Sequence, residues 1–452
     1  MPAKRILSAA MALLLASSFA APSGVRAASD GGFEYTVTDG VATVTGCTST
    51  CPVTLVIPAT LGGNFVTGIA SLAFDGENLA SVSIPDRVES IGPYAFYDNH
   101  LGSVKLPFWL ETIGISAFEF NAITSVVIPI YVTSIGNFAF QGNALAAVRL
   151  NSLLVSIGNY AFADNALTSV SIPNDVTTIG TGAFYGNELS YLKLGASVVT
   201  IGSSAFYDNN LTSLVIPNSV ISVEAGAFMF NDLTSLTLST SMTTITSSSF
   251  AENALTSVSI PPSVETIGNG AFSDNLLSKL VIPGTVDAVD EYAFARNALT
   301  SVSFLGDAPT AGNNVFSDNA GLAAVSRVNS ATGWSGTWSG VPVVIVDARA
   351  TATVKPTVTG TSTVGRTLTA AKGTWAGYPA PTFTYQWYAC TRAVSAASST
   401  VPATCKKITG ATKSTFRLTS AQRGKFVAVL VAGKSLRTAA TPWLSVTTTK
   451  VK

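Results

Sequence analysis

The stretch Ala161-Phe-Ala-Asp-Asn-Ala-Leu-Thr-Ser-Val-Ser-Ile-Pro-Asn-Asp-Val-Thr-Thr-Ile-Gly-Thr-Gly182 decides the fold of this 452-residue chain. Its first two residues return as Ala183-Phe184, so the repeating unit is 22 residues long. Phenylalanine keeps this spacing through twelve copies: Phe74, Phe96, Phe118, Phe140, Phe162, Phe184, Phe206, Phe228, Phe250, Phe272, Phe294 and Phe316. A fixed period of this length predicts a solenoid, in which each unit covers the apolar face of its neighbour.

Within one unit, the segment Leu167–Ile172 alternates apolar and small polar residues, which is typical of a half-buried strand. Pro173 has no N–H group and closes the strand. Val176 and Ile179 follow at a spacing of three, so we expect them to point inward from a short 3₁₀-like or extended arc. Gly180 then allows a tight bend. Asn stands three residues after Phe in eleven copies, from Asn99 to Asn319, where a buried side chain can bond the backbone of adjacent coils.

These motifs resemble the BspA-like subclass of leucine-rich repeats, found in bacterial surface and secreted proteins. The resemblance covers residues 34–347 and rests on the pattern I-P-x-x-V-x-x-I-G-x-x-A-F. It implies a leucine-rich repeat solenoid with a parallel β face on one side and short 3₁₀ or irregular arcs on the other. An all-β module follows it in the chain.

The chain divides into five predicted segments. Residues 1–27 resemble a secretory signal peptide, with an apolar run after Lys4 and Arg5. Residues 28–71 form an N-terminal β-hairpin cap, 72–316 the solenoid and 317–347 its C-terminal cap, while 348–452 form a separate β-sandwich. No second apolar stretch approaches membrane-spanning length, so the mature chain is expected to have no transmembrane segment.

Both solenoid caps have recognisable sequences. In the N-terminal cap, two alternating segments flank Asp39-Gly40, a strong hairpin turn signal. Cys47 and Cys51 lie four residues apart, and in an exported protein a small disulfide is the natural interpretation. In the C-terminal cap, residues 341–346 are typical of a closing strand. Trp334 and Trp338 fit sealing of the last coil better than binding of sugar.

The segment 348–452 resembles the Ig-like modules appended to secreted actinobacterial proteins. Period-2 segments such as Phe383–Tyr388, between Gly and Pro turns, predict a β-sandwich of short strands. The similarity itself rests on the runs Pro356-Thr-Val-Thr-Gly360, Val364-Gly-Arg-Thr-Leu368, Gly373-Thr-Trp375 and Tyr385-Gln-Trp387. It implies a disulfide between Cys390 and Cys405. What such modules bind is not well defined, so the resemblance implies little about function.

The net charge of zero hides a strong asymmetry. Residues 28–348 hold all 25 Asp and Glu but only 7 Lys and Arg, a net charge of −18. Residues 349–452 hold 15 Lys and Arg and no acid, a net charge of +15. The basic module is therefore a candidate for binding polyanions such as an anionic cell-wall polymer, although its cations could simply keep it soluble. The export signal makes nucleic acid a poor partner. The candidate polyanion-binding residues are Lys406, Lys407, Lys413, Arg417, Arg423 and Lys425.

Constellations for catalysis are nearly absent from the sequence. His100 is the only histidine and stands at a variable position of the repeat, so we expect no catalytic residues, no metal site and no cofactor. Asp164, Asp208 and Asp274 recur two residues after Phe, which indicates a turn role. An active site should instead appear as a break in one or two copies.

Such breaks occur on the predicted strand face, which is otherwise rich in Ser and Thr. The candidate ligand-binding residues there are Lys105, Arg149, Tyr191, Lys193 and Lys279. Taken singly, each also fits an ordinary solvated position. Because solenoids commonly bind along such a sheet, the face as a whole is the predicted site.

The sequence therefore predicts a secreted or cell-surface adhesion protein that recognises an extracellular protein or glycan and is held at the wall by its basic module. The main alternative is a glycan- or ice-binding solenoid that acts through its Ser/Thr ladder, which a thermal-hysteresis assay would separate from adhesion. A third hypothesis is a carbohydrate-active enzyme, which would need two close carboxylates in a deep cleft.

Overall fold

The computed structural model describes residues 26–328, 330–346, 350–376, 381–434 and 441–452. Two compact units emerge from the contacts. The first holds the chain up to Val302 together with residues 309–323 and 339–341, and the second holds residues 303–308, 324–338 and 342–452. The predicted signal peptide lies outside the described residues, apart from its last two.

The N-terminal end of the first unit is the predicted hairpin, and the structure confirms it. Thr38 pairs with Val41 across the turn at Asp39 and Gly40, which have φ of 52° and 78°. Cys47 and Cys51 form the predicted disulfide. The strands of this end are β1 (Arg26–Asp30), β2 (Phe33–Thr38), β3 (Val41–Cys47), β5 (Thr60–Leu61) and β6 (Asn64–Ile69).

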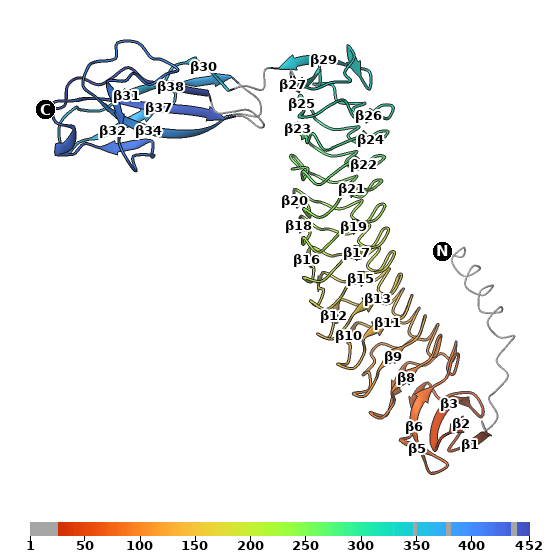
Figure 1. Ribbon diagram of the computed structural model, residues 1–452. Helices are drawn as coiled ribbons and strands as arrows, with labels where there is room; N and C mark the ends of the chain where they lie inside the picture. Colours follow the sequence, from red (N-terminus) through yellow and green to blue (C-terminus); the bar gives the residue numbers. More distant parts are fainter. Residues whose placement is uncertain (1–25, 329, 347–349, 377–380, 435–440) are drawn as a thin grey trace. The chain divides into compact units, whose positions relative to one another are not determined.

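Each coil of the solenoid then contributes up to two short strands (Figure 1). The first kind places its middle residue inward and comprises β4 (Thr54–Val56), β7 (Ser81–Ser83), β10 (Ser125–Val127), β12 (Ala147–Arg149), β14 (Ser169–Ser171), β16 (Tyr191–Lys193), β18 (Ser213–Val215), β20 (Ser235–Thr237), β23 (Lys279–Ile282) and β25 (Ser301–Phe304). The second kind comprises β8 (Ser90–Ile91), β9 (Thr112–Ile113), β11 (Ser134–Ile135), β13 (Ser156–Ile157), β15 (Thr178–Ile179), β17 (Thr200–Ile201), β19 (Ser222–Val223), β21 (Thr244–Ile245), β22 (Thr266–Ile267), β24 (Ala288–Val289) and β26 (Thr310–Ala311).

The second set of strands corrects the expectation of a single parallel face. From β6 through β19 these strands form one continuous parallel sheet, while the first set pairs mostly in twos, such as β10 with β12. The arcs are therefore extended rather than 3₁₀-like at this point. Apart from β24 and β26, each two-residue strand turns a Ser or Thr outward and an Ile or Val inward, so a strand of this length already satisfies both faces.

The glycine after this strand has a different role from the predicted bend. Gly114 donates its N–H to the carbonyl of Ile91 in the preceding coil at 2.8 Å. A Cβ on Gly114 would lie 2.5 Å from the backbone carbon of Gly92. Glycine is required here because neighbouring coils approach closely, and its φ is not in the left-handed region.

Phenylalanine fills the centre of every coil. Successive rings from Phe74 to Phe316 stack with centroids 5.2 to 6.0 Å apart. All but the last are fully buried. Each ring thus covers the next, and the solenoid gains a continuous aromatic core that no single unit could bury alone.

The asparagine ladder bonds adjacent coils, as the sequence predicts. Asn209 donates from Nδ2 to the carbonyl of Phe184 at 3.0 Å, and its Oδ1 accepts from the N–H of Leu189 at 3.0 Å. The equivalent bonds recur in all eleven copies. These amides satisfy backbone groups that the short strands leave without a partner.

The second unit begins with the end of the solenoid, where Trp334 and Trp338 pack against Phe304 with ring centroids 4.9 and 4.7 Å apart. This arrangement confirms that they seal the last coil. Residues 341–346 form the predicted closing strand. The strands here are β27 (Val325–Val328), β28 (Thr337–Trp338) and β29 (Val341–Val346).

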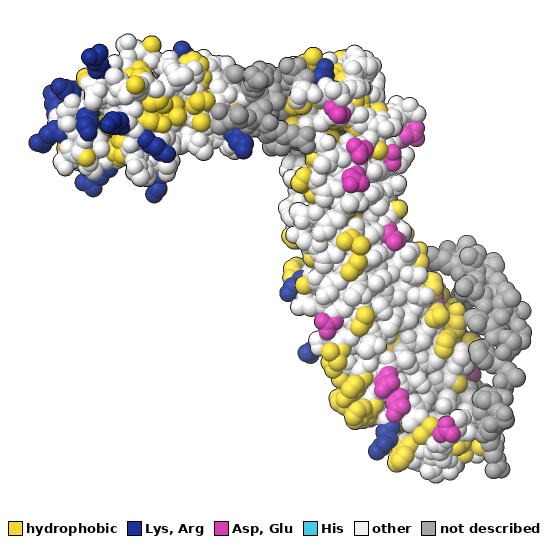
Figure 2. All heavy atoms as spheres, in the orientation of Figure 1, with side chains coloured by type: hydrophobic (Ala, Val, Ile, Leu, Met, Phe, Trp, Pro, Cys, Tyr) yellow, Lys and Arg dark blue, Asp and Glu magenta, His cyan; other side chains and the backbone are white. Residues whose placement is uncertain are grey.

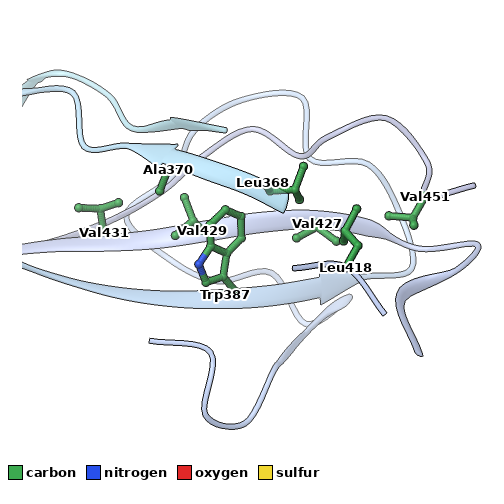
Figure 3. Close-up of a cluster of buried hydrophobic side chains, with 8 residues drawn as sticks. All are labelled: Leu368, Ala370, Trp387, Leu418, Val427, Val429, Val431 and Val451. Atoms are coloured by element: carbon green, nitrogen blue, oxygen red, sulfur yellow. The ribbon is translucent and has the colours of Figure 1, made fainter. Parts of the chain in front are cut away.

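The rest of the second unit is antiparallel. Side chains from β32, β34 and β37 meet in one buried cluster around Trp387 (Figure 3), and Cys390 and Cys405 form the disulfide that the module resemblance implies. The elements are β30 (Thr351–Val354), β31 (Thr357–Thr359), β32 (Thr367–Ala371), β33 (Thr374–Ala376), β34 (Thr382–Cys390), β35 (Cys405–Lys407), β36 (Thr415–Arg417), the 3₁₀ helix η1 (Ser420–Gln422), β37 (Phe426–Lys434) and β38 (Thr441–Leu444).

Candidate binding surface

Three of the predicted ligand-binding cations form a row on the solenoid. Arg149 ends β12 and pairs with Val127, while Lys193 ends β16 and pairs with Ser171. Lys105 stands two coils before Arg149, at the same position of the repeat, in a coil that forms no strand there. All three side chains are exposed. Because stacked strands lie ~4.8 Å apart, the charges of this cationic row (Lys105, Arg149, Lys193) recur at intervals of about 10 Å.

The other two predicted residues are placed differently. Tyr191 is exposed at the first position of β16, two residues before Lys193. Lys279 occupies the corresponding first position of β23, four coils further on. At the spacing of stacked strands this is about 19 Å from Tyr191. The structure thus brings Tyr191 to the cationic row and leaves Lys279 apart.

Two valines on the same surface escaped the sequence analysis. Val127 stands at the position of the cationic row in the coil between Lys105 and Arg149, and Val215 stands there in the coil after Lys193. Their side chains are 61% and 66% exposed. The signal was present, because these outward positions carry Val where other copies carry Ser or Thr. The row therefore alternates cations with aliphatic or small residues, so a ligand would meet both charge and apolar surface.

The cations of the row differ in their partners. Lys105 Nζ lies 3.4 Å from Asp86 Oδ1, and both side chains are largely exposed. Such a pair contributes little to stability and is readily exchanged for another anion. Among the described residues, Arg149 and Lys193 make no ion pair. The row is consequently available to an external carboxylate or sulfate.

The serines and threonines form two separate ladders. The predicted ladder on the first set of strands, including Ser125 and Ser169, lies on short, interrupted strand pairs. A second ladder follows the continuous sheet, where the hydroxyls of Ser134 and Ser156 bond one another at 2.8 Å. The regular array therefore lies mainly on a surface that the sequence analysis did not single out.

In the second unit, the backbone brings several predicted polyanion-binding residues to one end. Cys390 pairs with both Cys405 and Phe426. Lys406 directly follows Cys405 and Lys425 directly precedes Phe426, so the two lysines lie at neighbouring strand ends. The N–H of Val451 donates to the carbonyl of Lys425 at 2.8 Å. The N–H of Leu418 donates to the carbonyl of Arg366, and the N–H of Val364 donates to the carbonyl of Lys452. These bonds bring Arg366 and Lys452 to the same end. We call this the basic end: Arg366, Lys406, Arg417, Arg423, Lys425, Lys450 and Lys452.

Figure 2 shows Lys and Arg side chains gathered where this unit carries the C-terminus. Lys407 and Lys413 lie further along, next to Tyr388 and Trp387. Arg366, Lys450 and Lys452 were missed because their contribution depends on long-range pairing. Residues 350–452 contain no Asp or Glu, so no acidic side chain of this segment neutralises the basic end.

Comparison with known proteins establishes the family of the solenoid. The model of the BspA-type leucine-rich repeat region matches six copies, over residues 67–190, 155–278 and 199–323. Together these ranges cover more than half of the 452 residues. The chain belongs to the BspA-type leucine-rich repeat family. Its resemblance to that family is thereby confirmed for the solenoid.

Solved structures similar to this leucine-rich repeat protein come from several bacteria. The pneumococcal vaccine antigen PcpA is 20% identical, with a TM-score of 0.49 over 71% of this chain and 94% of that one. A leucine-rich cell surface protein from Faecalibacterium prausnitzii is 23% identical, with 0.40 over 70% and 97%. A leucine-rich repeat protein from Bacteroides ovatus is 20% identical, with 0.48 over 71% and 100%. The comparison with curated proteins gives no match.

The described residues include no helix with the length and hydropathy that a membrane span requires. In the same residues, no group of three or more His, Cys, Asp or Glu side chains is placed to hold a metal ion. The recurring Asp164, Asp208 and Asp274 have φ of 53° to 56°, which confirms their predicted role in turns.

Glu119 is the one buried carboxyl of the leucine-rich repeats. Burial raises its pKa from 4.5 to about 7, although a hydrogen bond from Ser116 favours the ionised form. The protonated form thus stabilises the fold fully below pH 4.5, and this contribution is lost as the pH rises through 7. We expect the free energy of unfolding to fall by about 3 kcal/mol across that window.

The variant Glu119→Gln, measured by thermal unfolding below pH 4.5 and above pH 7, should lose this dependence and exceed the wild type in stability at the higher pH. Glu111→Gln, at an exposed position, is the control and should keep the wild-type profile. Equal pH profiles for Glu119→Gln and the wild type would contradict the assignment.

Proposed function

We propose that this protein is an exported, non-enzymatic binding protein that recognises an acidic extracellular protein or glycan through the cationic row and Tyr191. The observation that carries the proposal is the placement of Lys105, Arg149 and Lys193 in one column of alternate coils. Elsewhere that column carries Ser, Thr or Val, and the surrounding solenoid is strongly acidic. A row of cations on an otherwise acidic solenoid creates a local positive potential, so anionic ligands are attracted to the row and repelled by the surface around it.

Export is inferred from the sequence of residues 1–27 and from the use of cysteine. All four cysteines are paired in two disulfides, which form and persist in oxidising compartments. Surface attachment is proposed through the second unit. We infer that residues 348–452 form an Ig-like β-sandwich, because antiparallel sheets share one core around Trp387, and that its basic end holds an anionic cell-wall polymer.

The site can be mapped with two probes, polyglutamate as an acidic peptide and hyaluronan as an acidic glycan. We expect at least one probe to protect Lys105 and Lys193 of the full chain from amine acylation, read by mass spectrometry, while Lys279 stays reactive. Reading single lysines separates the solenoid from the basic end. Equal protection of Lys279 and Lys193, or no protection of the row, would refute the proposed site.

Replacing Lys105, Arg149 and Lys193 by serine, the residue that stands naturally at position 171, tests the same site energetically. Exposed charges contribute about 0.5 kcal/mol each, so the affinity measured at the solenoid should fall about tenfold. Lys279→Ser is the matched control and should leave the affinity unchanged.

A further inference from the structure

A cluster of exposed apolar side chains interrupts the solenoid surface in three successive coils. It consists of Phe108, Trp109, Ile130, Tyr131, Leu153 and Val155, and we call it the aromatic patch. Phe108 and Trp109 are 54% and 49% exposed, and the others are exposed to a similar degree. Figure 2 shows hydrophobic side chains gathered on the N-terminal half of the solenoid. With about 200 Å² for a large side chain, the six expose on the order of 500 Å².

The fold does not require these residues. Five of the six occupy the two positions after the Pro position of the repeat, where later coils carry pairs such as Asn174-Asp175 and Asn218-Ser219. Val155 stands two residues further on, where the next coil carries Thr177. Those coils form the same turns, with Val220 donating to Pro217 at 3.0 Å where Leu110 donates to Pro107 at 3.2 Å. The patch is therefore a local break in the repeat. Other copies carry polar residues at its positions and still form the same fold.

The aromatic rings are ordered by one another. Trp109 and Tyr131 stack with centroids 5.1 Å apart and planes 11° from parallel. Phe108 packs nearly perpendicular to both, at 5.1 Å from Trp109 and 5.7 Å from Tyr131. Rings held in place in this way lose little entropy when a partner covers them.

The aromatic patch lies on the same coils as the start of the cationic row. Lys105 stands three residues before Phe108, and Arg149 stands four residues before Leu153. A ligand that covers the patch thus meets two exposed cations at its edge. A Trp, a Tyr and neighbouring cations are the residues in which binding energy concentrates at protein interfaces, with charged groups at the rim.

We propose that the aromatic patch binds an extended segment of a partner protein, in which aromatic or aliphatic side chains stand next to carboxylates. The patch alone is smaller than the roughly 800 Å² per partner of a standard interface, so the cationic row supplies the rest. A glycan fits less well, because Trp109 and Tyr131 cover one face of each other and Ile130, Leu153 and Val155 cannot bond hydroxyl groups. The requirement for carboxylates in the ligand (the acidic rim) rests on the proposed function, whereas binding of its apolar side chains by the aromatic patch (the apolar anchor) does not.

The test is selection from a displayed library of random peptides on the full chain. We expect enriched peptides to combine aromatic or aliphatic residues with Asp or Glu. Their affinity should fall about 30-fold in a variant carrying Phe108→Asn, Trp109→Ser and Tyr131→Ser, which copies the pattern at Asn218-Ser219. Phe138→Ser with Tyr160→Ser is the control. It removes another stacked pair of partly exposed rings, 5.4 Å apart, at positions where Ser116 and Ser204 stand naturally.

Several outcomes would overturn the proposal. The first is enrichment of peptides that lack apolar residues, and the second is an equal loss of peptide affinity in the patch variant and its control. The third is patch-dependent binding of neutral glycans on an array, with no binding of peptides. The fourth is dimer formation, measured by sedimentation velocity, that the patch variant abolishes. Lys105→Ser with Arg149→Ser distinguishes this proposal from the proposed function. If that variant keeps peptide binding and the patch variant loses it, the apolar anchor stands while the acidic rim and the role of the row fail.

Discussion

Replacing Lys406, Arg423 and Lys425 by glutamine is expected to weaken binding of the full chain to purified Gram-positive cell walls by about 100-fold at low salt. Each cation close to an anionic surface contributes about 1 kcal/mol, and about 3 kcal/mol corresponds to roughly that factor. The three residues belong to the basic end, where the backbone holds their strand ends together. The measurement is co-sedimentation with walls over a range of protein concentration.

The second unit offers a control with the same change of charge. Lys355, Lys372 and Lys434 are exposed cations of the other end. Thr382 pairs with Lys434 there, while Cys390 pairs with Phe426 at the basic end. Lys372 lies over Phe383, which pairs with Gly433, and Lys355 lies over Trp443, which pairs with Val431. If binding depends on net charge alone, the two triple variants lose affinity equally. If the basic end is the site, the control keeps most of the affinity. High salt should release the wild type in either case, because the Debye length falls to about 3 Å at 1 M.

Equal losses in the two variants would leave the second unit as a diffusely charged module. Failure of the wild type to sediment would remove the anchor from the proposed function altogether. The row on the solenoid would then remain as the only candidate contact with an acidic partner, and the footprinting of Lys105 and Lys193 would decide it independently.

The periodic features of this molecule could be predicted from the sequence, because each depends on contacts that recur every 22 residues. Phe184 stacks on Phe206 and Asn209 bonds Phe184 for the same reason that their equivalents do in every coil. The hairpin at Asp39-Gly40 could also be predicted, since its turn chemistry is local. The continuous second sheet was missed because two residues such as Thr178-Ile179 are too short to give an alternating pattern.

The candidate sites were predicted less completely, because a site depends on which copies differ and on what lies beside them. Lys105 and Arg149 stood out as charges in a column of Ser. Phe108 and Trp109 did not, although the same positions carry Asn218-Ser219 in a later copy, because the repeat pattern leaves these two positions unspecified and their exposure becomes known only from the structure. Lys452 joins the basic end through the pairing of Val364 with the chain terminus, a contact that no local pattern encodes.

The asparagine ladder yields a large expected change in stability. Asn209 is 5% exposed and serves two backbone groups of the preceding coil, the carbonyl of Phe184 and the N–H of Leu189. Alanine at this position leaves the N–H of Leu189 buried without a partner and removes one of the two side-chain hydrogen bonds to the carbonyl of Phe184, which keeps the bond from Asn187 Nδ2 at 3.2 Å. At about 2 kcal/mol for the unsatisfied N–H and about 1 kcal/mol for the lost bond to Phe184, Asn209→Ala should lower the free energy of unfolding by about 3 kcal/mol, measured by denaturant titration.

The neighbouring residue provides the control. Asn210→Ala removes an exposed amide from the variable position of the same coil and should change the stability by less than about 0.5 kcal/mol. Because contacts in a solenoid join only adjacent coils, the loss at Asn209 should appear first as faster amide exchange of Leu189 and its neighbours. If Asn209→Ala and Asn210→Ala cost the same, the amide serves the turn alone, and the phenylalanine stack and the backbone hydrogen bonds between coils account for the stability.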